Sequence, residues 1–207
     1  MKKLKVGILL FDYVDILDFA GPAEILSLTV KSKAEQALTL YKKHLLPTRP
    51  FEVYTITEKG MKIVTHSGIK VEPDFSIDLS PELDILIIPG GPLRAVQAIA
   101  KNQKIIDWIN THKNIEYLCS VCTGAYILGE TGLLDGKKVT THHLALKMLR
   151  EKYPDIQVLS DRKVVQDGNI ISSGGVSSGI NMALYLVEQI LGESTANRTA
   201  KTIEFIL

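Results

Sequence analysis

The chain has 207 residues, 45% of them hydrophobic, which fits one α/β domain with a single substantial core. Its 24 basic and 23 acidic residues give a net charge of +1. This balance argues against partners such as nucleic acid or an anionic membrane, and no apolar stretch reaches the length of a membrane span. Two cysteines cannot form the disulfide framework of a secreted protein, so we expect a cytoplasmic protein.

Short β-rich segments alternate with helical segments along the chain. The first half predicts, in order, a strand at 5–11, a helix at 23–30 opened by Gly21-Pro22, a polar and partly helical excursion at 31–50, a strand at 51–57, a hairpin at 63–71, a strand at 83–88, and helices at 94–100 and 105–112. The second half predicts a strand at 115–121, a helix at 123–134, a strand at 138–141, a helix at 144–152, a hairpin around Asp167-Gly168 and a helix at 178–191. This alternation predicts a three-layer α/β sandwich with a mostly parallel central sheet, and residues 1–207 are expected to form a single domain.

Both cysteines lie near the end of the strand at 115–121. Cys122 falls where this strand gives way to a helix, and Gly124 permits a sharp turn there. Functional groups in open parallel sheets gather at the carboxyl ends of the strands. A thiol placed at a helix N-terminus can have its pKa lowered from about 8.5 to roughly 3.5–7.5. The pattern therefore favours Cys122 as a nucleophile.

Other uses of the cysteines stay open at this point. Strand alternation places Cys119 and Cys122 on different faces, which disfavours a redox dithiol. A zinc site would need His142 or His143 together with a further ligand, and the spacing typical of zinc sites is absent. Cys122 as an inert buried thiol is a further alternative, and Cys119 fits a small apolar side chain in the core. We expect neither a metal nor a cofactor.

Two glycines and a threonine are candidates for binding the substrate. Gly90 and Gly91 follow the buried strand at 83–88, and their amides could form half of an oxyanion hole. The amide of Thr123 would supply the other half. An ordinary Gly-Gly turn is the alternative interpretation.

Asp18 is an acid among apolar residues just after the first strand. A carboxyl placed there could have a raised pKa, keep its proton and donate a hydrogen bond to the sulfur. A helix cap is the alternative role, and Asp12 and Asp15 are expected at the surface. His142, after the strand at 138–141, could act as a base or proton shuttle, although a lone histidine is more often structural. His44, His66, His112 and His143 lack a comparable context.

Several motifs together resemble the ThiJ/PfpI superfamily. They are Asp18-Phe19-Ala20-Gly21-Pro22, Ile88-Pro89-Gly90-Gly91, Ser120-Val121-Cys122-Thr123-Gly124-Ala125, Val139-Thr140-Thr141-His142 and the segment 167–175. The resemblance covers nearly the whole chain. It implies the flavodoxin-like fold of class I glutamine-amidotransferase domains.

Within this superfamily, the aspartate and the Cys-Thr-Gly sequence are similar to isonitrile hydratases and to the sensor domains of AraC-type regulators. The resemblance implies that Cys122 is the nucleophile and Asp18 its acid partner, while Gly90, Gly91 and Thr123 shape a site for a small-molecule substrate. It also implies a homodimer, which the apolar ending 203–207 supports. His142 matches the histidine of another branch, and hydratases do not depend on it.

The resemblance leaves the reaction open, because relatives with one cysteine elbow perform different chemistry. Hydration of an isonitrile to an N-substituted formamide is the first hypothesis. A glyoxalase, deglycase or amidase-like hydrolase is the rival enzyme class, and a redox or ligand sensor that uses Cys122 is the non-enzyme alternative. The segment 31–50 looks longer than in the hydratases, and no helix-turn-helix domain follows, which argues against a complete regulator.

Overall fold

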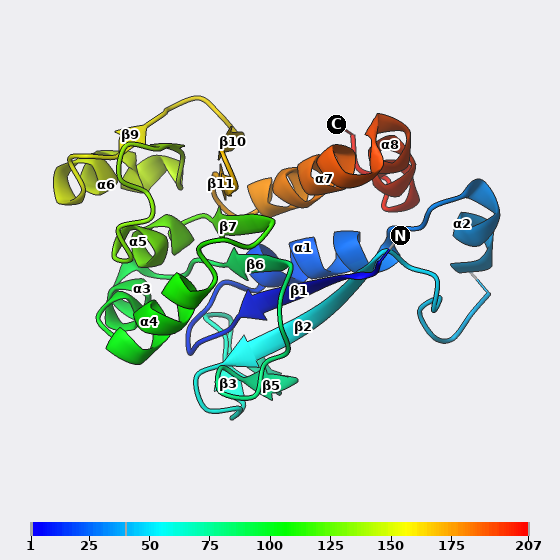
Figure 1. The fold of residues 1–207 in the computed structure, drawn as a ribbon, viewed down its shortest axis with the longest axis horizontal. Coiled ribbons are helices and arrows are strands. Elements are labelled where there is room, and N and C mark those ends of the chain that lie inside the picture. Colours follow the sequence, from blue (N-terminus) through cyan, green and yellow to red (C-terminus); the bar gives the residue numbers. More distant parts are fainter. Residues whose placement is uncertain (1, 40, 207) are drawn as a thin grey trace.

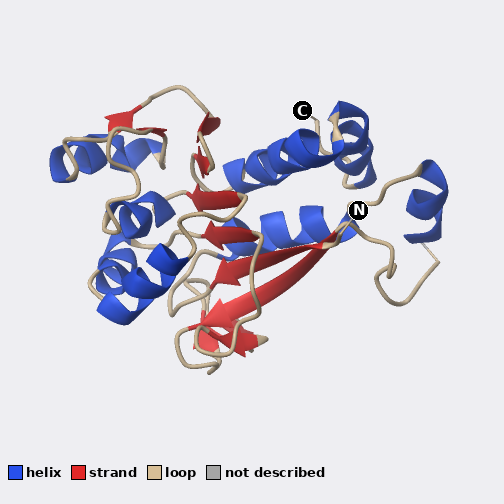
Figure 2. Cartoon of the chain, viewed as in Figure 1, coloured by secondary structure: helices blue, strands red, loops and turns tan. Residues whose placement is uncertain are grey.

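The computed structural model describes residues 2–39 and 41–206, and its centre is a seven-stranded sheet (Figures 1 and 2). The strand order is β10-β11-β7-β6-β1-β2-β5. The bounds are β1 Leu4–Leu9, β2 Phe51–Thr57, β5 Phe75–Ser76, β6 Ile85–Ile88, β7 Tyr117–Val121, β10 Val164–Asp167 and β11 Ile170–Ser173. All neighbours pair in parallel except β10 and β11, so the predicted mostly parallel α/β fold is confirmed.

Helices flank this sheet in two packed groups (Figure 1). The first group contains α1 Ile16–Leu28, α7 Ser178–Leu191 and α8 Glu193–Thr202. The second contains α3 Leu93–Ala100, α4 Gln103–Thr111 and α5 Gly124–Gly129. The strand β6 is buried at all four positions, as its uninterrupted apolar sequence predicts for a strand covered on both faces.

Smaller elements complete the chain. They are α2 Lys33–Thr39, the antiparallel pair β3 Ile63–Val64 and β4 Lys70–Val71, the parallel pair β8 Lys138–Val139 and β9 Gln157–Val158, the 3₁₀ helix η1 His143–Ala145 and α6 Leu146–Lys152. Both predicted hairpins are present, and Gly168 in the second has a φ of 65°, which its turn requires. The helical part of the 31–50 excursion is α2.

The start of α1 differs from the sequence prediction. This helix begins at Ile16, so Gly21-Pro22 lies inside it and does not open it. Tertiary packing explains the difference, because Gly21 and Pro22 are buried where α1 meets α7. A Cβ atom on Gly21 would lie 3.1 Å from Ile180 of α7, so glycine lets the two helices approach closely. As a result Asp18 stands in the first turn of a helix.

The segment predicted as a helix at 123–134 is shorter in the structure. α5 ends at Gly129, and turns with positive φ at Gly132 and Gly136 follow. The predicted strand 138–141 likewise ends at Val139.

α8 lies beyond the predicted elements. Its sequence lacks an apolar stripe; it packs on α7, and its buried residues, such as Ala196 and Ala200, are small. Ile203 and Phe205 pack against the core and Ile206 is exposed, whereas Leu207 of the predicted apolar ending lies outside the described residues.

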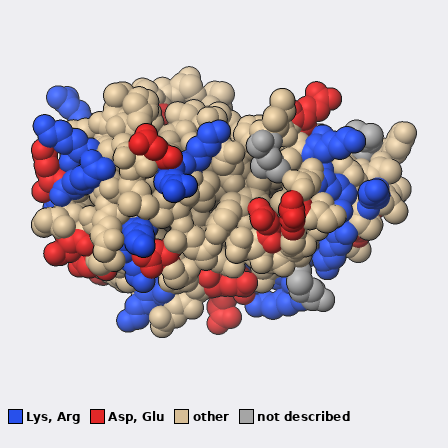
Figure 3. All heavy atoms as spheres, turned by 90° about the horizontal axis from the view of Figure 1, so that it is seen from above, with Lys and Arg blue, Asp and Glu red and all other residues tan. Residues whose placement is uncertain are grey.

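Charged residues are dispersed over the surface. On the face shown in Figure 3, acidic and basic side chains are interspersed, in line with the nearly balanced charge. Within residues 2–39 and 41–206, no helix has both the length and the apolar character needed to cross a membrane.

Candidate active site

Cys122 stands in a strained turn between β7 and α5. Its φ is 55°, a left-handed value that residues other than glycine rarely adopt. The turn is fixed by its backbone N–H, which donates to the carbonyls of Ser173 at 3.2 Å and Gly174 at 3.0 Å. A Cβ atom on Gly124 would overlap the carbonyl oxygen of Ile88, so only glycine fits beside β6. These features form the predicted sharp strand-to-helix turn at the carboxyl edge of the sheet, while the role of Cys122 as a nucleophile stays a prediction.

The thiol of Cys122 is protonated in this environment. Burial raises its pKa to about 12, the negative charge of Asp18 adds to the effect, and the backbone amides of Thr123 and Val176 oppose it. The sequence predicted a lowered pKa at a helix N-terminus, and this was wrong. Only 3% of the residue is exposed and α5 has six residues, so desolvation outweighs the two amides.

Asp18 is completely buried in the first turn of α1. Its Oδ2 atom accepts a hydrogen bond of 2.9 Å from the amide of Gly90. Its Oδ1 atom has no hydrogen-bond partner among the described residues. Burial raises the pKa of Asp18 to about 7, although the Gly90 amide opposes this shift, and the charge of Asp15 raises it further. Asp18 can therefore both accept and release a proton near neutral pH, and its unpartnered oxygen is the atom available to do so.

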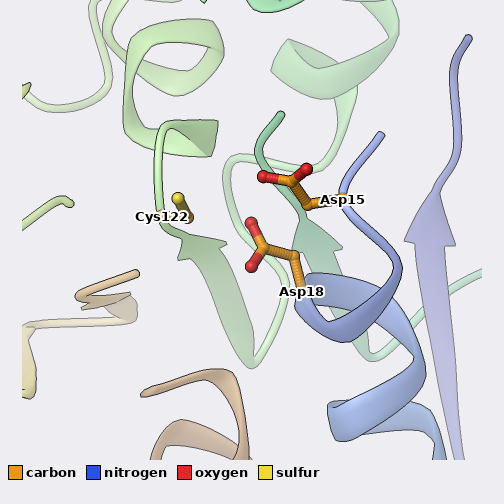
Figure 4. Close-up of side chains that lie close together, drawn as sticks. All are labelled: Asp15, Asp18 and Cys122. Atoms are coloured by element: carbon orange, nitrogen blue, oxygen red, sulfur yellow. The ribbon is translucent and has the colours of Figure 1, made fainter. Parts of the chain in front are cut away.

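Asp15, Asp18 and Cys122 point toward one another (Figure 4). One ligand-type atom from each of the three side chains lies within 4.8 Å of the other two. Side chains of these three types can also ligate a metal ion, and such binding would require Asp18 and Cys122 to lose their protons.

Asp15 was expected at the surface, and its side chain is 27% exposed, but the sequence did not reveal its place beside Asp18 and Cys122. It is the N-cap residue of α1, half-buried, and its Oδ1 atom lies 3.1 Å from Nδ1 of His66. The expected later start of the helix concealed the signal that could have located Asp15. Residues three apart in a helix share a face, so Asp15 accompanies Asp18 once the helix begins at Ile16. His66, in the turn between β3 and β4, also went unrecognised.

The loop of Gly90 and Gly91 frames the site. Thr123 Oγ1 accepts from the amide of Gly91 at 2.9 Å and donates to its carbonyl at 2.7 Å. A Cβ atom on Gly90 would lie 2.5 Å from Thr123 Oγ1 and 3.0 Å from Asp18 Oδ2, so this close approach requires glycine. The amides of Gly90 and Gly91 are thus engaged, while those of Thr123 and Val176 act on the sulfur. The oxyanion role of the glycines stays a prediction.

The loop after β11 supplies a contact that the sequence did not reveal. Val176 has a φ of 47°, and its amide interacts with both Cys122 and Asp18. A positive φ at valine leaves no trace in a single sequence. Thr141 was also missed as a support of the elbow: its hydroxyl donates to the Cys122 carbonyl at 2.7 Å.

His142 lies beside this loop. Its Nδ1 atom accepts from the amide of Leu144 at 3.3 Å, and its ring lies against the Cα of Gly175. Burial and the neighbouring His143 lower its pKa. Among the described hydrogen bonds, none joins His142 to Cys122 or Asp18. Its role as a proton shuttle stays a prediction.

Known proteins resemble this chain in both sequence and fold. The chain is 30% identical over 204 residues to an isonitrile hydratase of Pseudomonas putida, covering 98% of this chain and 78% of that protein. It is 28% identical over 157 residues to the HTH-type transcriptional regulator CdhR of Pseudomonas aeruginosa, covering 74% of this chain and 44% of the regulator. A crystal structure of a ThiJ/PfpI family protein from Pseudomonas syringae superposes with a TM-score of 0.83 at 22% identity, over all of this chain and 77% of that one. The sequence pattern of the DJ-1/PfpI family matches residues 4–189, and the chain therefore belongs to this family.

Proposed function

We propose that this protein is a cysteine-dependent enzyme that hydrates an isonitrile to an N-substituted formamide. The observation that carries the proposal is the buried carboxyl of Asp18: one of its oxygens lies within 4.8 Å of the thiol of Cys122, and its Oδ1 atom has no hydrogen-bond partner among the described residues. A carboxyl with a pKa of about 7 can take a proton from a thiol and deliver it to carbon at neutral pH. The similarity to the P. putida isonitrile hydratase supports this choice of substrate.

The reaction follows from one proton that moves between Cys122 and Asp18. Ionised Asp18 takes the thiol proton as the sulfur attacks the terminal carbon of the isonitrile and forms a C–S bond. Asp18 then returns this proton to the same carbon, which gives a thioimidate. Water adds to that carbon, the C–S bond breaks and the sulfur regains a proton. The sum is one isonitrile plus one water giving one formamide.

The site also fits two other uses. A cysteine hydrolase, or an enzyme acting on 2-oxoaldehydes and their adducts, would use the same sulfur against a carbonyl carbon. A redox or ligand sensor would use Cys122 without turnover. The similarity to the transcriptional regulator favours this last candidate.

A turnover screen separates these candidates. The wild-type protein and the variants Cys122→Ser and Asp18→Asn are incubated with alkyl and aryl isonitriles, with 2-oxoaldehydes and with simple amides, and the products are quantified by mass spectrometry. We expect formamides from the wild type and none from Cys122→Ser. Turnover confined to 2-oxoaldehydes or amides would contradict hydration. No turnover of any class, together with ready oxidation of Cys122, would favour the sensor.

We further propose that the protein is a cytoplasmic homodimer, as the family resemblance implies. The exposed Ile206 near the C-terminus supports an apolar contact between copies. Light scattering at micromolar concentration tests this, and a mass of one chain would contradict it.

A further inference from the structure

A cavity lies next to the candidate active site but outside it. Its volume is about 750 Å³, within the range of pockets that hold drug-sized ligands. It lies between the segments after β1 and β2, the helix α3 and the turn that leads into β3. We call it the apolar pocket. Its apolar lining includes Leu10, Phe11, Met61, Ile63, Ile99 and Ile105.

The apolar pocket is separated from the thiol by the backbone after β1. Cys122, Asp18 and the two loop glycines do not line it. The carbonyl of Tyr13 reaches to 2.6 Å from where a Cβ atom on Gly91 would stand, so this segment forms a wall between the pocket and the glycine loop. Tyr13 and Met61 line the pocket with 58% and 65% of their surface exposed, so large apolar side chains stand uncovered there.

The charges at the apolar pocket favour an anionic ligand. Lys59, Lys62 and Arg94 line it, and none of them forms an ion pair with another described residue. Two acidic residues, Asp12 and Glu58, also line it, so the three basic side chains outnumber the carboxylates. Asp12 accepts from the amide of Val64 at 2.9 Å. Glu58 accepts from the side chain of Asn102 at 2.9 Å. A ligand therefore meets an apolar floor and three cations that lack ion-pair partners, whereas one oxygen of each carboxylate is held by a hydrogen bond to the protein.

One side chain connects the apolar pocket with the active site. His66 lines the pocket and lies 3.1 Å from Asp15, which in turn stands beside Asp18 and Cys122. The charge of Asp15 favours the protonated forms of both. An anion in the pocket would compete with Asp15 for His66 and leave the Asp15 charge less compensated. The thiolate of Cys122 would then be harder to form.

We propose that the apolar pocket binds a small molecule with an apolar body and one carboxylate, and that this ligand lowers the reactivity of Cys122 through the contact between His66 and Asp15. The proposal concerns a site outside the one assigned to isonitrile hydration. It can be tested without turnover.

The binding test uses octanoate, with 1-octanol and octyltrimethylammonium as neutral and cationic probes of equal chain length. Titration calorimetry measures the binding of each probe. We expect octanoate to bind at least tenfold tighter than either. Ala98→Trp, on an exposed lining position of α3, should weaken octanoate binding at least tenfold, whereas Gln97→Trp next to it should not. Lys62→Gln combined with Arg94→Gln should weaken it about fivefold, because exposed charge contacts contribute modestly, while Lys70→Gln with Lys101→Gln should have no effect. Equal binding of the three probes, or binding insensitive to Ala98→Trp, would overturn the pocket assignment.

The coupling test measures alkylation of Cys122 by iodoacetamide with and without saturating octanoate. We expect octanoate to slow the wild-type reaction about two- to fivefold, a modest factor because the side chain of His66 is 59% exposed. In His66→Asn octanoate should still bind, but the rate should no longer change. An unchanged wild-type rate, or a slowing that persists in His66→Asn, would overturn the coupling. Neither measurement depends on whether isonitriles are substrates.

Discussion

The two cysteines differ in their polar neighbours far more than in their exposure. Cys119 is fully buried and Cys122 is 3% exposed, and burial raises the pKa of both thiols above the ordinary value. Cys119 has burial as the only resolved cause of its shift. Cys122 instead meets the amides of Thr123 and Val176 and the carboxyl of Asp18.

This difference shows that the backbone turn at Cys122, and not exposure of its thiol to solvent, sets the candidate site apart from Cys119. At Cys119 the backbone amide and carbonyl belong to the sheet, since β7 pairs with β6 and β11. At Cys122 the positive φ turns the chain out of the sheet, toward the amides that follow it and toward the first turn of α1. At the edge of the sheet, backbone amides and carboxyl groups that take no part in strand pairing can then interact with the sulfur of Cys122.

Exchange of each cysteine is the strongest test of this comparison. In Cys122→Ser, turnover of the best isonitrile should fall at least about a thousandfold, because the weaker nucleophile cannot replace the sulfur. Cys119→Ala should keep turnover within a factor of about two, since it leaves only a small cavity in the sheet. Steady-state kinetics on both variants measure the contrast. Equal losses would show that the elbow confers no special role.

The carboxyl of Asp18 is the second feature that distinguishes the surroundings of Cys122 from those of Cys119. Asp18→Asn keeps the hydrogen-bonding shape but removes the transferable proton, so turnover should fall by a factor on the order of a hundred. Asp78→Asn, at an exposed ion pair with Lys104, is the matched control and should have no effect on the rate. Unchanged turnover in Asp18→Asn would leave Asp18 with a structural role alone.

The sequence predicted most of the fold because its signals were local and strong. Continuous apolar runs such as Ile85–Ile88 and turn residues such as Asp167-Gly168 required no knowledge of distant contacts. The position of α1 could not be predicted in this way. Proline in a helix is disfavoured by its own chemistry, and only packing against α7 retains Pro22 there.

The same distinction applies to the candidate site. Cys122 and Asp18 were found because an elbow and an acid among apolar residues are unusual within the sequence itself. Val176 acts through a backbone amide that any residue type carries. His66 reaches Asp15 across 51 residues of chain. The lowered thiol pKa was wrongly predicted because burial arises from the whole fold and outweighed the helix terminus.

The pH dependence of stability provides an independent test of the Asp18 environment. Its pKa is raised from 3.8 when unfolded to about 7 when folded, so between these values the folded state holds a proton that the unfolded state has lost. Stability from this group is therefore present at acidic pH and is lost as pH rises through about 7. Asp18→Asn removes this loss. The free energy of unfolding of Asp18→Asn minus that of the wild type should therefore be larger at about pH 8.5 than at about pH 5, by on the order of 2 kcal/mol. The variant is thus stabilised relative to the wild type at the higher pH.

Urea denaturation of both proteins at the two pH values measures this difference. Asp78→Asn serves again as the control, because the exposed side chain of Asp78 should produce little change with pH. A difference between wild type and Asp18→Asn that is independent of pH would contradict a raised pKa at Asp18.

Alkylation at neutral pH separates the two thiols without any substrate. Iodoacetamide reacts with the thiolate, and the raised pKa of Cys122 predicts slow labelling compared with a free cysteine. Cys122 should still react at least about tenfold faster than Cys119, which is reached only when the sheet opens.

Asp18→Asn should accelerate labelling of Cys122 several-fold, because the carboxylate charge that opposes the thiolate is gone, and it should leave Cys119 unchanged. Peptide mapping after limited alkylation measures all four rates. Faster alkylation combined with lost turnover in one variant would show that Asp18 contributes to turnover by transferring a proton during the reaction and not by lowering the pKa of the resting thiol. Slower alkylation in Asp18→Asn would instead mean that the carboxyl promotes thiolate formation at rest.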